Sequence, residues 1–395
     1  MRALEGLKVA DFSGHASGPI CSMLLGDFGA DVIKIEPPSG DKARKWGHAR
    51  YGEKQDISSE FVALNRNKNS IVIDLKNPEG LELARQIIKK CDVVLENMKP
   101  GVMERLGLGY EAVSKLKPEI VYCSLSAFGQ TGPLSRRPGF DLLMQALCGP
   151  LSVTGEPGRP TSRIGPSAID VLTGAHGVVG ILVALRERDH SGRGQLVDTS
   201  LYESAIHLMS HMIADYTGTG VPSGKWGPYF PFIAPYGIFM AQDREFYIGC
   251  STDQMFTRFC NAIQRPELLE DPRFLTTGDR AKNQRQLYDI LEPLFRAAPA
   301  QSWVDLAESL TIPTSLIRDL TEVVKQEQAL AREIVVPVEG LSPVKIAGLP
   351  IKLSRTPADI RKPPPTLGAD TDDVLRRLGF ADSEVARLKA ARAVR

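Results

Sequence analysis

The sequence has almost no net charge and no long apolar run. Its 395 residues include 48 Lys and Arg against 47 Asp and Glu, which gives a net charge of +1. That balance argues against nucleic acid or an anionic membrane as a partner. The longest apolar run, residues 177–185, is too short to cross a bilayer. Residues 1–30 show no apolar leader with a cleavage site, so we expect a cytoplasmic protein.

Several familiar motifs are also missing. The six cysteines form no CxxC pair, which favours buried thiols in a reducing compartment over disulfides or a zinc site. No GxGxxG follows the first apolar stretch, which argues against a dinucleotide site. A P-loop and a GxSxG elbow are absent as well. The sequence therefore shows none of the motifs typical of a zinc site, a dinucleotide site, a P-loop or a nucleophile elbow.

The first 200 residues alternate short apolar stretches with helical patterns. Strands are expected near residues 7–12, 32–35, 70–75, 93–96, 120–125 and 194–199. Helices are expected near residues 17–29, 81–90, 170–188 and 201–216, with Ser17 and Asn77 as N-caps. Short apolar strands between helices are typical of a parallel sheet in a layered α/β domain. We therefore expect a large Rossmann-like α/β domain.

The pattern changes after residue 217. Residues 218–235 are rich in Gly, Pro and aromatic residues, and 236–241 with 245–250 read as a β-hairpin. Helical patterns then fill 252–331. We predict a large domain from residues 1–225, a smaller α+β domain from 226–325, and a return to the first domain over 326–395.

Asp170 permits two interpretations. It precedes a long, nearly uncharged stretch, residues 171–185. An aspartate there is typical of an N-cap. The same position, at a helix N-terminus in an apolar setting, also suits a carboxylate nucleophile. The hydrophobic periodicity of the sequence does not distinguish an N-cap from a nucleophile at Asp170.

Two further groups of residues deserve interpretation. Glu203, His207, His211 and Asp215 recur every four residues, a spacing that suits either a metal or polar packing at an interface. The lack of HExxH favours packing.

A set of cations falls near expected strand ends, where they would suit a phosphorylated ligand. This set comprises Arg66, Lys68, Lys76, Lys99 and Arg105.

The order of many short motifs resembles the family III CoA-transferases, which include the formyl-CoA:oxalate and carnitine-type enzymes. The resemblance covers nearly the whole chain. Its motifs include Leu4-Glu5-Gly6-Leu7-Lys8-Val9, Asp27-Phe28-Gly29-Ala30-Asp31-Val32, Asn65-Arg66-Asn67-Lys68, Pro100-Gly101-Val102-Met103, Phe128-Gly129-Gln130-Thr131-Gly132-Pro133 and Asp271-Pro272-Arg273-Phe274.

The resemblance implies a mechanism and a set of site residues. The family's nucleophilic aspartate matches Asp170, which would form an aspartyl anhydride and then an aspartyl-CoA thioester. The substrates implied are an acyl-CoA, such as succinyl-CoA, and a small carboxylic acid, with no resident cofactor. The CoA-binding positions carried over are Ala16, Ser17, Asp74, Leu75, Lys76, Asn97, Met98, Lys99, Arg105, Arg137 (or Arg136) and Asp141.

Some positions depart from the family pattern. Residue 16 is Ala where the formyl-CoA enzyme has a polar amide, and Pro37 stands in place of a CoA-binding arginine. The related 2-methylacyl-CoA racemases carry a His in the stretch that reads Gly139-Phe140-Asp141 here. Phenylalanine does not transfer protons, so racemisation is disfavoured. A non-catalytic acyl-CoA-binding protein is the other alternative, and Asp170 speaks against it.

The acceptor acid and the assembly are also expectations. Aromatic residues crowd residues 226–239 and suit either an acid-binding wall or an interface. Arg163 and Lys225 are hypothetical partners for a second carboxylate. In the resembling family two chains interlock as linked rings, so we expect a homodimer.

Overall fold

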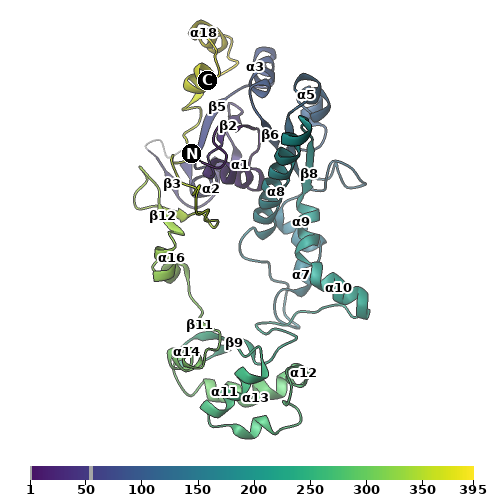
Figure 1. Ribbon diagram of the computed structural model, residues 1–395, viewed down its shortest axis with the longest axis vertical. Coiled ribbons are helices and arrows are strands. Elements are labelled where there is room, and N and C mark those ends of the chain that lie inside the picture. The colour runs from purple at the N-terminus through teal and green to yellow at the C-terminus, as the bar shows by residue number, and fades with distance from the viewer. Residues whose placement is uncertain (1, 53–56) are drawn as a thin grey trace. The chain divides into compact units, whose positions relative to one another are not determined.

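The computed structural model describes residues 2–52 and 57–395 (Figure 1). Contacts divide the chain into two compact units. The first comprises residues 1–149, 164–213 and 327–395, and the second comprises 150–163 and 214–326. The second unit therefore begins at residue 214, not 226, and takes in residues 150–163 from an earlier part of the chain.

A six-stranded parallel sheet forms the centre of the first unit, as the alternating pattern predicts. Its strand order is β5-β2-β1-β6-β7-β8. The strands are β1 (Lys8–Asp11), β2 (Asp31–Glu36), β5 (Lys68–Val72), β6 (Val93–Glu96), β7 (Val121–Ser126) and β8 (Leu196–Ser200). The order reverses between β1 and β6, where doubly wound sheets open a crevice at the carboxyl ends of their strands.

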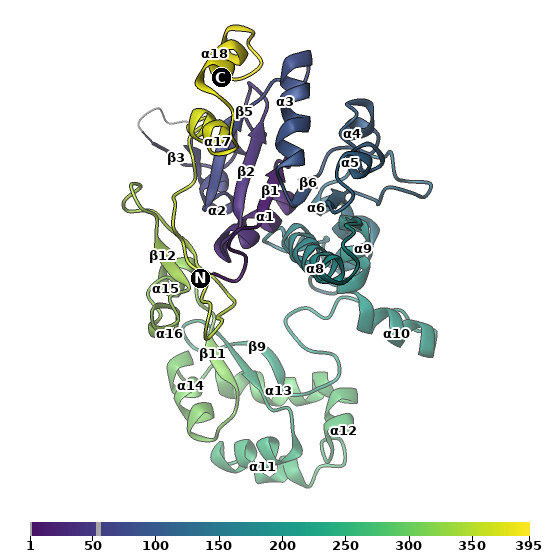
Figure 2. The ribbon, with the colours of Figure 1, turned by 45° about the horizontal axis from the view of Figure 1, so that its top comes forward.

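Helices cover both faces of this sheet because alternate strand residues point to opposite sides. Val9 faces a core formed with α1 (Ser17–Asp27) and α8 (Ala168–Ser191). Ala10 faces the opposite core. That core is completed by α3 (Pro78–Lys89), α5 (Tyr110–Leu116), α17 (Thr371–Arg377) and α18 (Asp382–Ala390). Figure 2 shows α17 and α18 beside β5 and α3.

Local signals set several helix ends. Asn77 caps α3 as predicted, accepting a hydrogen bond from the N–H of Glu79 at 2.9 Å. Ser17 does not cap α1: the helix begins at Ser17, and Ala16 holds the cap position without a side-chain bond. The helix predicted over 201–216 is two helices, α9 (Leu201–Leu208) and α10 (Ser210–Thr219).

The second unit contains a small antiparallel sheet with helices packed on it. The predicted hairpin is present as β9 (Tyr236–Met240) and β10 (Glu245–Gly249), joined by β11 (Thr314–Leu316). Its core includes Phe239, Phe246 and Phe295. The helices of this unit are α7 (Pro150–Val153), most of α10, α11 (Asp253–Ala262), η2 (Pro266–Leu269), α12 (Thr277–Lys282), α13 (Gln284–Phe295), α14 (Ala300–Ser309) and α15 (Leu320–Val323).

Smaller elements complete the first unit. They are η1 (Lys42–Lys45), β3 (Arg50–Tyr51), β4 (Ile57–Ser58), α2 (Ser59–Leu64), α4 (Val102–Arg105), α6 (Asp141–Leu147), α16 (Glu327–Ala331), β12 (Val335–Pro337) and β13 (Lys345–Ala347). Among the described helices, α8 has the length and apolar composition of a membrane span. Core helices of globular proteins share both properties, and Thr173, Gly174 and Gly177 of α8 are buried.

Candidate active site

Asp170 lies in the first turn of α8, and a second aspartate caps that helix. Asp170 is the third helical residue, so its interpretation as the N-cap is wrong; the cap residue is Ser167, whose side chain makes no capping bond. Asp141, the first residue of α6, takes that role from outside. One of its oxygens accepts hydrogen bonds from the N–H groups of Ile169 at 2.8 Å and Asp170 at 3.2 Å. The Asp170 carboxylate therefore remains outside the capping interaction.

The capping carboxylate is itself held in place. The side-chain amide of Gln145 donates to the other oxygen of Asp141. The carbonyl oxygen of that amide accepts from the N–H of Ile164 at 3.0 Å. Asp141 and Gln145 are both buried. This chain of hydrogen bonds fixes α6 against the segment that leads into α8.

Close packing of α8 against α1 sets the position of Asp170 along α1. A Cβ on Gly174 would lie 2.8 Å from the Ser17 carbonyl oxygen, and one on Gly177 would lie 3.1 Å from the Cys21 sulfur. The two helices therefore run side by side in the same sense. Asp170 lies one turn before Gly174 on the same face. It is thus level with residues 13–16, the turn that leads into α1.

Burial and neighbouring carboxylates weaken the acidity of Asp170. Burial, followed by the negative charges of Asp141 and Glu60, raises the pKa of Asp170 to about 7. Glu60 lies in the first turn of α2. A carboxylate destabilised in this way is less solvated and more basic than an ordinary aspartate, which suits a nucleophile.

The turn before α1 is held by Asn97. Its side chain accepts from the N–H of Gly14 at 2.9 Å and donates to the carbonyl of Gly14 at 2.7 Å. Asn97 follows β6, so this pair joins the loops after β1 and β6 at the point where the strand order reverses. Of the predicted CoA-binding residues here, Ser17 is buried and Ala16 is half-buried.

A pocket of about 560 Å³ opens at the carboxyl ends of β1, β2, β5 and β6. It brings together five of the predicted CoA-binding residues, namely Asp74, Leu75, Lys76, Met98 and Arg105. Pro37, which replaces an arginine of the resembling enzymes, lines it too. The pocket also contains two carboxylates, those of Asp74 and Glu36, and the Glu36 carboxylate is paired with Arg44 at 2.6 Å. The cations Lys76 and Arg105 beside a mainly apolar lining suit a ligand with both phosphates and an apolar part.

Other predicted CoA-binding residues lie outside this pocket. Lys99 is exposed in the turn after β6. Arg137 is exposed, with its guanidinium 6.0 Å from the centre of the Phe128 ring. Asp141 caps α8. The structure thus places part of the predicted set in the pocket and part of it near Asp170 or on the surface.

The structure contradicts the prediction that Arg66 and Lys68 lie at strand ends near a ligand. Both lie at the amino-terminal end of β5, and both are buried. Arg66 pairs with Asp27 at 2.8 Å and donates to the Ala347 carbonyl. Burial lowers the pKa of Lys68 to about 7. These two cations stabilise the fold instead of binding phosphate.

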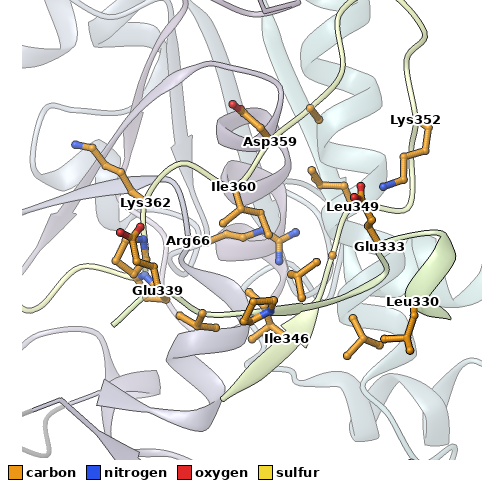
Figure 3. A pocket seen from close by; sticks show the side chains of 18 residues that line it. Arg66, Leu330, Glu333, Glu339, Ile346, Leu349, Lys352, Asp359, Ile360 and Lys362 are labelled. Atoms are coloured by element: carbon orange, nitrogen blue, oxygen red, sulfur yellow. The ribbon is translucent and has the colours of Figure 1, made fainter. Parts of the chain in front are cut away.

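Arg66 also reaches a second cavity of about 510 Å³ (Figure 3). Ile346 of β13, Ile360 and Leu330 line it with several charged side chains at its rim. The cavity lies between the β12–β13 hairpin and residues 358–364. Apart from Arg66, it contains none of the predicted site residues.

The described residues hold no cluster of three or more His, Cys, Asp or Glu side chains with metal-binding geometry. The predicted stripe is interrupted, because α9 ends at Leu208 before His211. His207 instead packs edge-to-face against His176, with ring centres 5.2 Å apart. All six cysteines are free thiols, five buried and Cys148 half-buried.

The predicted acid-binding residues of 226–239 belong to the second unit. Tyr229 packs against Tyr288 in that unit's core, with ring centres 4.5 Å apart. The Lys225 ammonium donates to the Arg159 carbonyl and the Thr161 hydroxyl, each at 3.2 Å. Arg163 is also in this unit. Their role as partners of a carboxylate remains a prediction.

Comparison with known proteins identifies the family of this chain. The model of CoA-transferase family III matches residues 4–371. The chain is 36% identical to a succinyl-CoA–D-citramalate CoA-transferase of Chloroflexus aurantiacus, over 100% of this chain and 98% of that protein. It is 31% identical to a succinyl-CoA:glutarate CoA-transferase of Homo sapiens, over 99% of this chain and 90% of that protein.

Solved structures show the same fold. A CAIB/BAIF family protein from Brucella suis superposes with a TM-score of 0.87 at 32% sequence identity, covering 95% of this chain and 99% of that one. The chain therefore belongs to CoA-transferase family III. It is a CoA-transferase, which confirms the class predicted from the sequence.

Proposed function

We propose that this enzyme moves CoA from succinyl-CoA to a dicarboxylic acid through covalent intermediates on Asp170. The proposal rests on the Asp170 carboxylate. This group is level with the turn before α1, and its pKa is raised to about 7. The named activities of the Chloroflexus and human relatives support the choice of donor and acceptor.

The first half-reaction loads CoA onto the enzyme. The Asp170 carboxylate attacks the thioester carbonyl of succinyl-CoA, the C–S bond breaks, and an aspartyl–succinyl anhydride and CoA thiolate form. The thiolate then attacks the aspartyl carbonyl of the anhydride. The C–O bond breaks, succinate leaves, and an aspartyl-CoA thioester remains.

The second half-reaction repeats these steps in reverse with the acceptor. The acceptor carboxylate attacks the aspartyl thioester and expels CoA thiolate, which leaves an aspartyl–acceptor anhydride. The thiolate attacks the acceptor carbonyl, releases the acceptor acyl-CoA and regenerates Asp170. Each step exchanges an acyl group between oxygen and sulfur without net proton transfer, so the scheme requires no metal or redox cofactor.

We place the nucleotide part of CoA in the pocket formed by Lys76, Arg105 and Met98. From there the pantetheine arm would pass the loops after β1 and β6, which Asn97 joins, on its way to Asp170. The phosphates would pair with Lys76 and Arg105, and the apolar lining would pack against the adenine.

Replacing Arg105 with alanine tests this placement. We expect the KM for succinyl-CoA to rise about tenfold with little change in kcat, because a phosphate contact contributes roughly equally to substrate and transition-state binding. Steady-state kinetics at saturating acceptor measures both constants. Lys115→Ala, an exposed cation on α5, is the matched control. A fall in kcat with an unchanged KM would contradict the placement.

The raised pKa of Asp170 predicts a pH dependence. Only the carboxylate attacks a thioester, so kcat/KM for succinyl-CoA should rise with pH through about 7. Glu60→Gln removes one of the charges that raise this pKa. We expect the midpoint to fall by about half a pH unit, since burial remains the larger cause.

The control for this pH profile is Glu82→Gln, which changes an exposed carboxylate on α3. Its midpoint should equal that of the wild type. A Glu60→Gln midpoint at or above the wild-type value would show that another group controls the profile.

A panel of acids tests the function as a whole. Purified enzyme with succinyl-CoA is incubated with succinate homologues, substituted dicarboxylic acids and monocarboxylic acids, and new acyl-CoA products are identified by mass spectrometry. A dicarboxylyl-CoA product formed together with free succinate is the expected result. Deuterium uptake into a 2-methylacyl-CoA without any acceptor would favour the racemase alternative.

We also propose that two copies of the chain form a homodimer. Val171, Val179 and Val183 of α8 are 53%, 60% and 63% exposed and follow one side of the helix. A stripe of that kind is typical of a surface covered by another chain. Light scattering should give the mass of two chains, and Val183→Glu should shift the distribution toward one chain. A wild-type monomer would contradict the proposal.

A further inference from the structure

His15 occupies an unusual position in the turn before α1. It lies in the turn that is level with Asp170, and its φ of +67° is in the left-handed region, which is unfavourable for residues other than glycine. The turn is fixed on both sides. The His15 N–H donates to Asp41 at 3.2 Å, and Asn97 holds Gly14. The fold therefore maintains an unfavourable backbone conformation at a residue of the site.

The His15 ring is part of an aromatic cluster formed with Trp46 and Phe140. Its centre lies 4.1 Å from the Trp46 ring and 5.9 Å from the Phe140 ring. Phe140 directly precedes Asp141, which contacts the N–H of Asp170. The cluster is open to solvent, with Trp46 46% and Phe140 64% exposed. It is therefore a surface that a small molecule could cover next to Asp170.

The ring nitrogens of His15 have hydrogen-bonding capacity to spare. Among residues 2–52 and 57–395, neither nitrogen has a hydrogen-bond partner. Burial lowers the pKa of His15, so the neutral imidazole, which has one N–H donor, dominates near pH 7. Lys42 and Lys34 act in the same direction, and Asp41 opposes them. Lys34 is buried and paired with Asp41 at 2.9 Å, so Lys42, which is exposed, is the lysine whose charge favours an anionic group near the ring.

We propose that His15 determines the acid specificity of the enzyme by donating a hydrogen bond to the distal carboxylate of a dicarboxylic substrate. The methylene chain of that substrate packs against Trp46 and Phe140, while its other carboxylate reacts at Asp170. This inference rests on the proposed CoA transfer through Asp170. The same contact serves the succinyl group of the donor and the acceptor acid, because both pass through one acyl site.

The test compares two acids of the same chain length, glutarate and pentanoate, with succinyl-CoA as the donor. Pentanoate has a methyl group where glutarate has its second carboxylate. We expect wild-type enzyme to prefer glutarate in kcat/KM, and His15→Leu to reduce the glutarate-to-pentanoate ratio by roughly 10- to 100-fold, the value of one hydrogen bond to a charged group. His15→Gln retains a donor and should restore part of the ratio.

The control is His190→Leu, an exposed histidine in the last turn of α8, which should leave the ratio unchanged. A wild-type ratio in His15→Leu would overturn the proposal for His15 and leave CoA transfer intact. If wild-type enzyme transfers CoA to neither of these acids nor to any other acid of the panel, the proposed function fails instead.

A measurement on wild-type enzyme applies even if the variants fold poorly. Proton NMR of the histidine rings gives the pKa of His15 in the presence of CoA and either acid. Glutarate should raise that pKa, because its second carboxylate faces the ring, and pentanoate should not. Equal pKa values with the two acids would overturn the proposal.

Discussion

Asp170→Asn is expected to reduce CoA transfer by at least about a thousandfold, because the amide does not form the anhydride. Residual exchange is measured by following labelled succinate into succinyl-CoA. In wild-type enzyme, hydroxylamine added during turnover should convert Asp170 to a hydroxamate, and peptide mass mapping should find the modification there. Asp189→Asn, an exposed aspartate of the same helix, should retain full activity.

The same substitution should stabilise the protein above pH 7. The folded-state pKa of Asp170 is about 7, above the unfolded value near 4, so the folded state binds more protons between these pH values. The stability of the wild type therefore falls as pH rises from about 4 to 7. Asparagine removes this effect, so we expect a gain of about 2 kcal/mol in the free energy of unfolding at pH 8.

Denaturant unfolding of wild type and Asp170→Asn at pH 8 and pH 5 checks the sign of this pH dependence. The stability gained by the variant should be smaller at pH 5. Two results would contradict the assignment of Asp170. One is an Asp170→Asn enzyme that still exchanges CoA, and the other is a variant whose added stability does not depend on pH.

Gly174→Ala should reduce both stability and activity, although it leaves every proposed site residue in place. The new Cβ would lie 2.8 Å from the Ser17 carbonyl oxygen and from the Ile20 side chain. Since α1 and α8 must then separate, we expect a loss of about 2–3 kcal/mol in the free energy of unfolding. We also expect a fall in kcat of about tenfold, because a small displacement misplaces the nucleophile.

The matched control is Gly218→Ala, a helical glycine of α10 whose added Cβ meets no atom within 4 Å. It should leave activity unchanged and be neutral or slightly stabilising, because alanine is the better helix former. Equal effects of the two substitutions on kcat would show that the contact of α1 with α8 does not position Asp170.

The sequence predicted the sheet well because buried parallel strands leave a local signal of short apolar runs between helices. It placed Lys76 and Arg105 after the carboxyl ends of strands, and both line the pocket there; their binding to CoA stays a prediction. It failed for Arg66 and Lys68 because both precede the strand expected at residues 70–75 and so lie at its amino-terminal end, away from the crevice. At that end the two cations have a structural role.

The surroundings of Asp170 could not be predicted in the same way. Asp141 caps α8 from 28 residues away, and nothing in its local sequence shows that contact. His15 and Trp46 meet only because the loops after β1 and β2 converge. The alternation of strands and helices predicts that such loops share one edge of the sheet, but it does not pair individual side chains.

The discontinuity of the first unit has a consequence for biosynthesis. Asp370 accepts from the N–H of Ser70 in β5 across 300 residues, and α17 and α18 complete the core on that face of the sheet. At 5–20 residues per second, a ribosome needs roughly 15–60 s to make the intervening chain. During that interval the apolar face of β5 and α3 lacks its cover in the nascent polypeptide, and it is the surface on which we expect a chaperone to act.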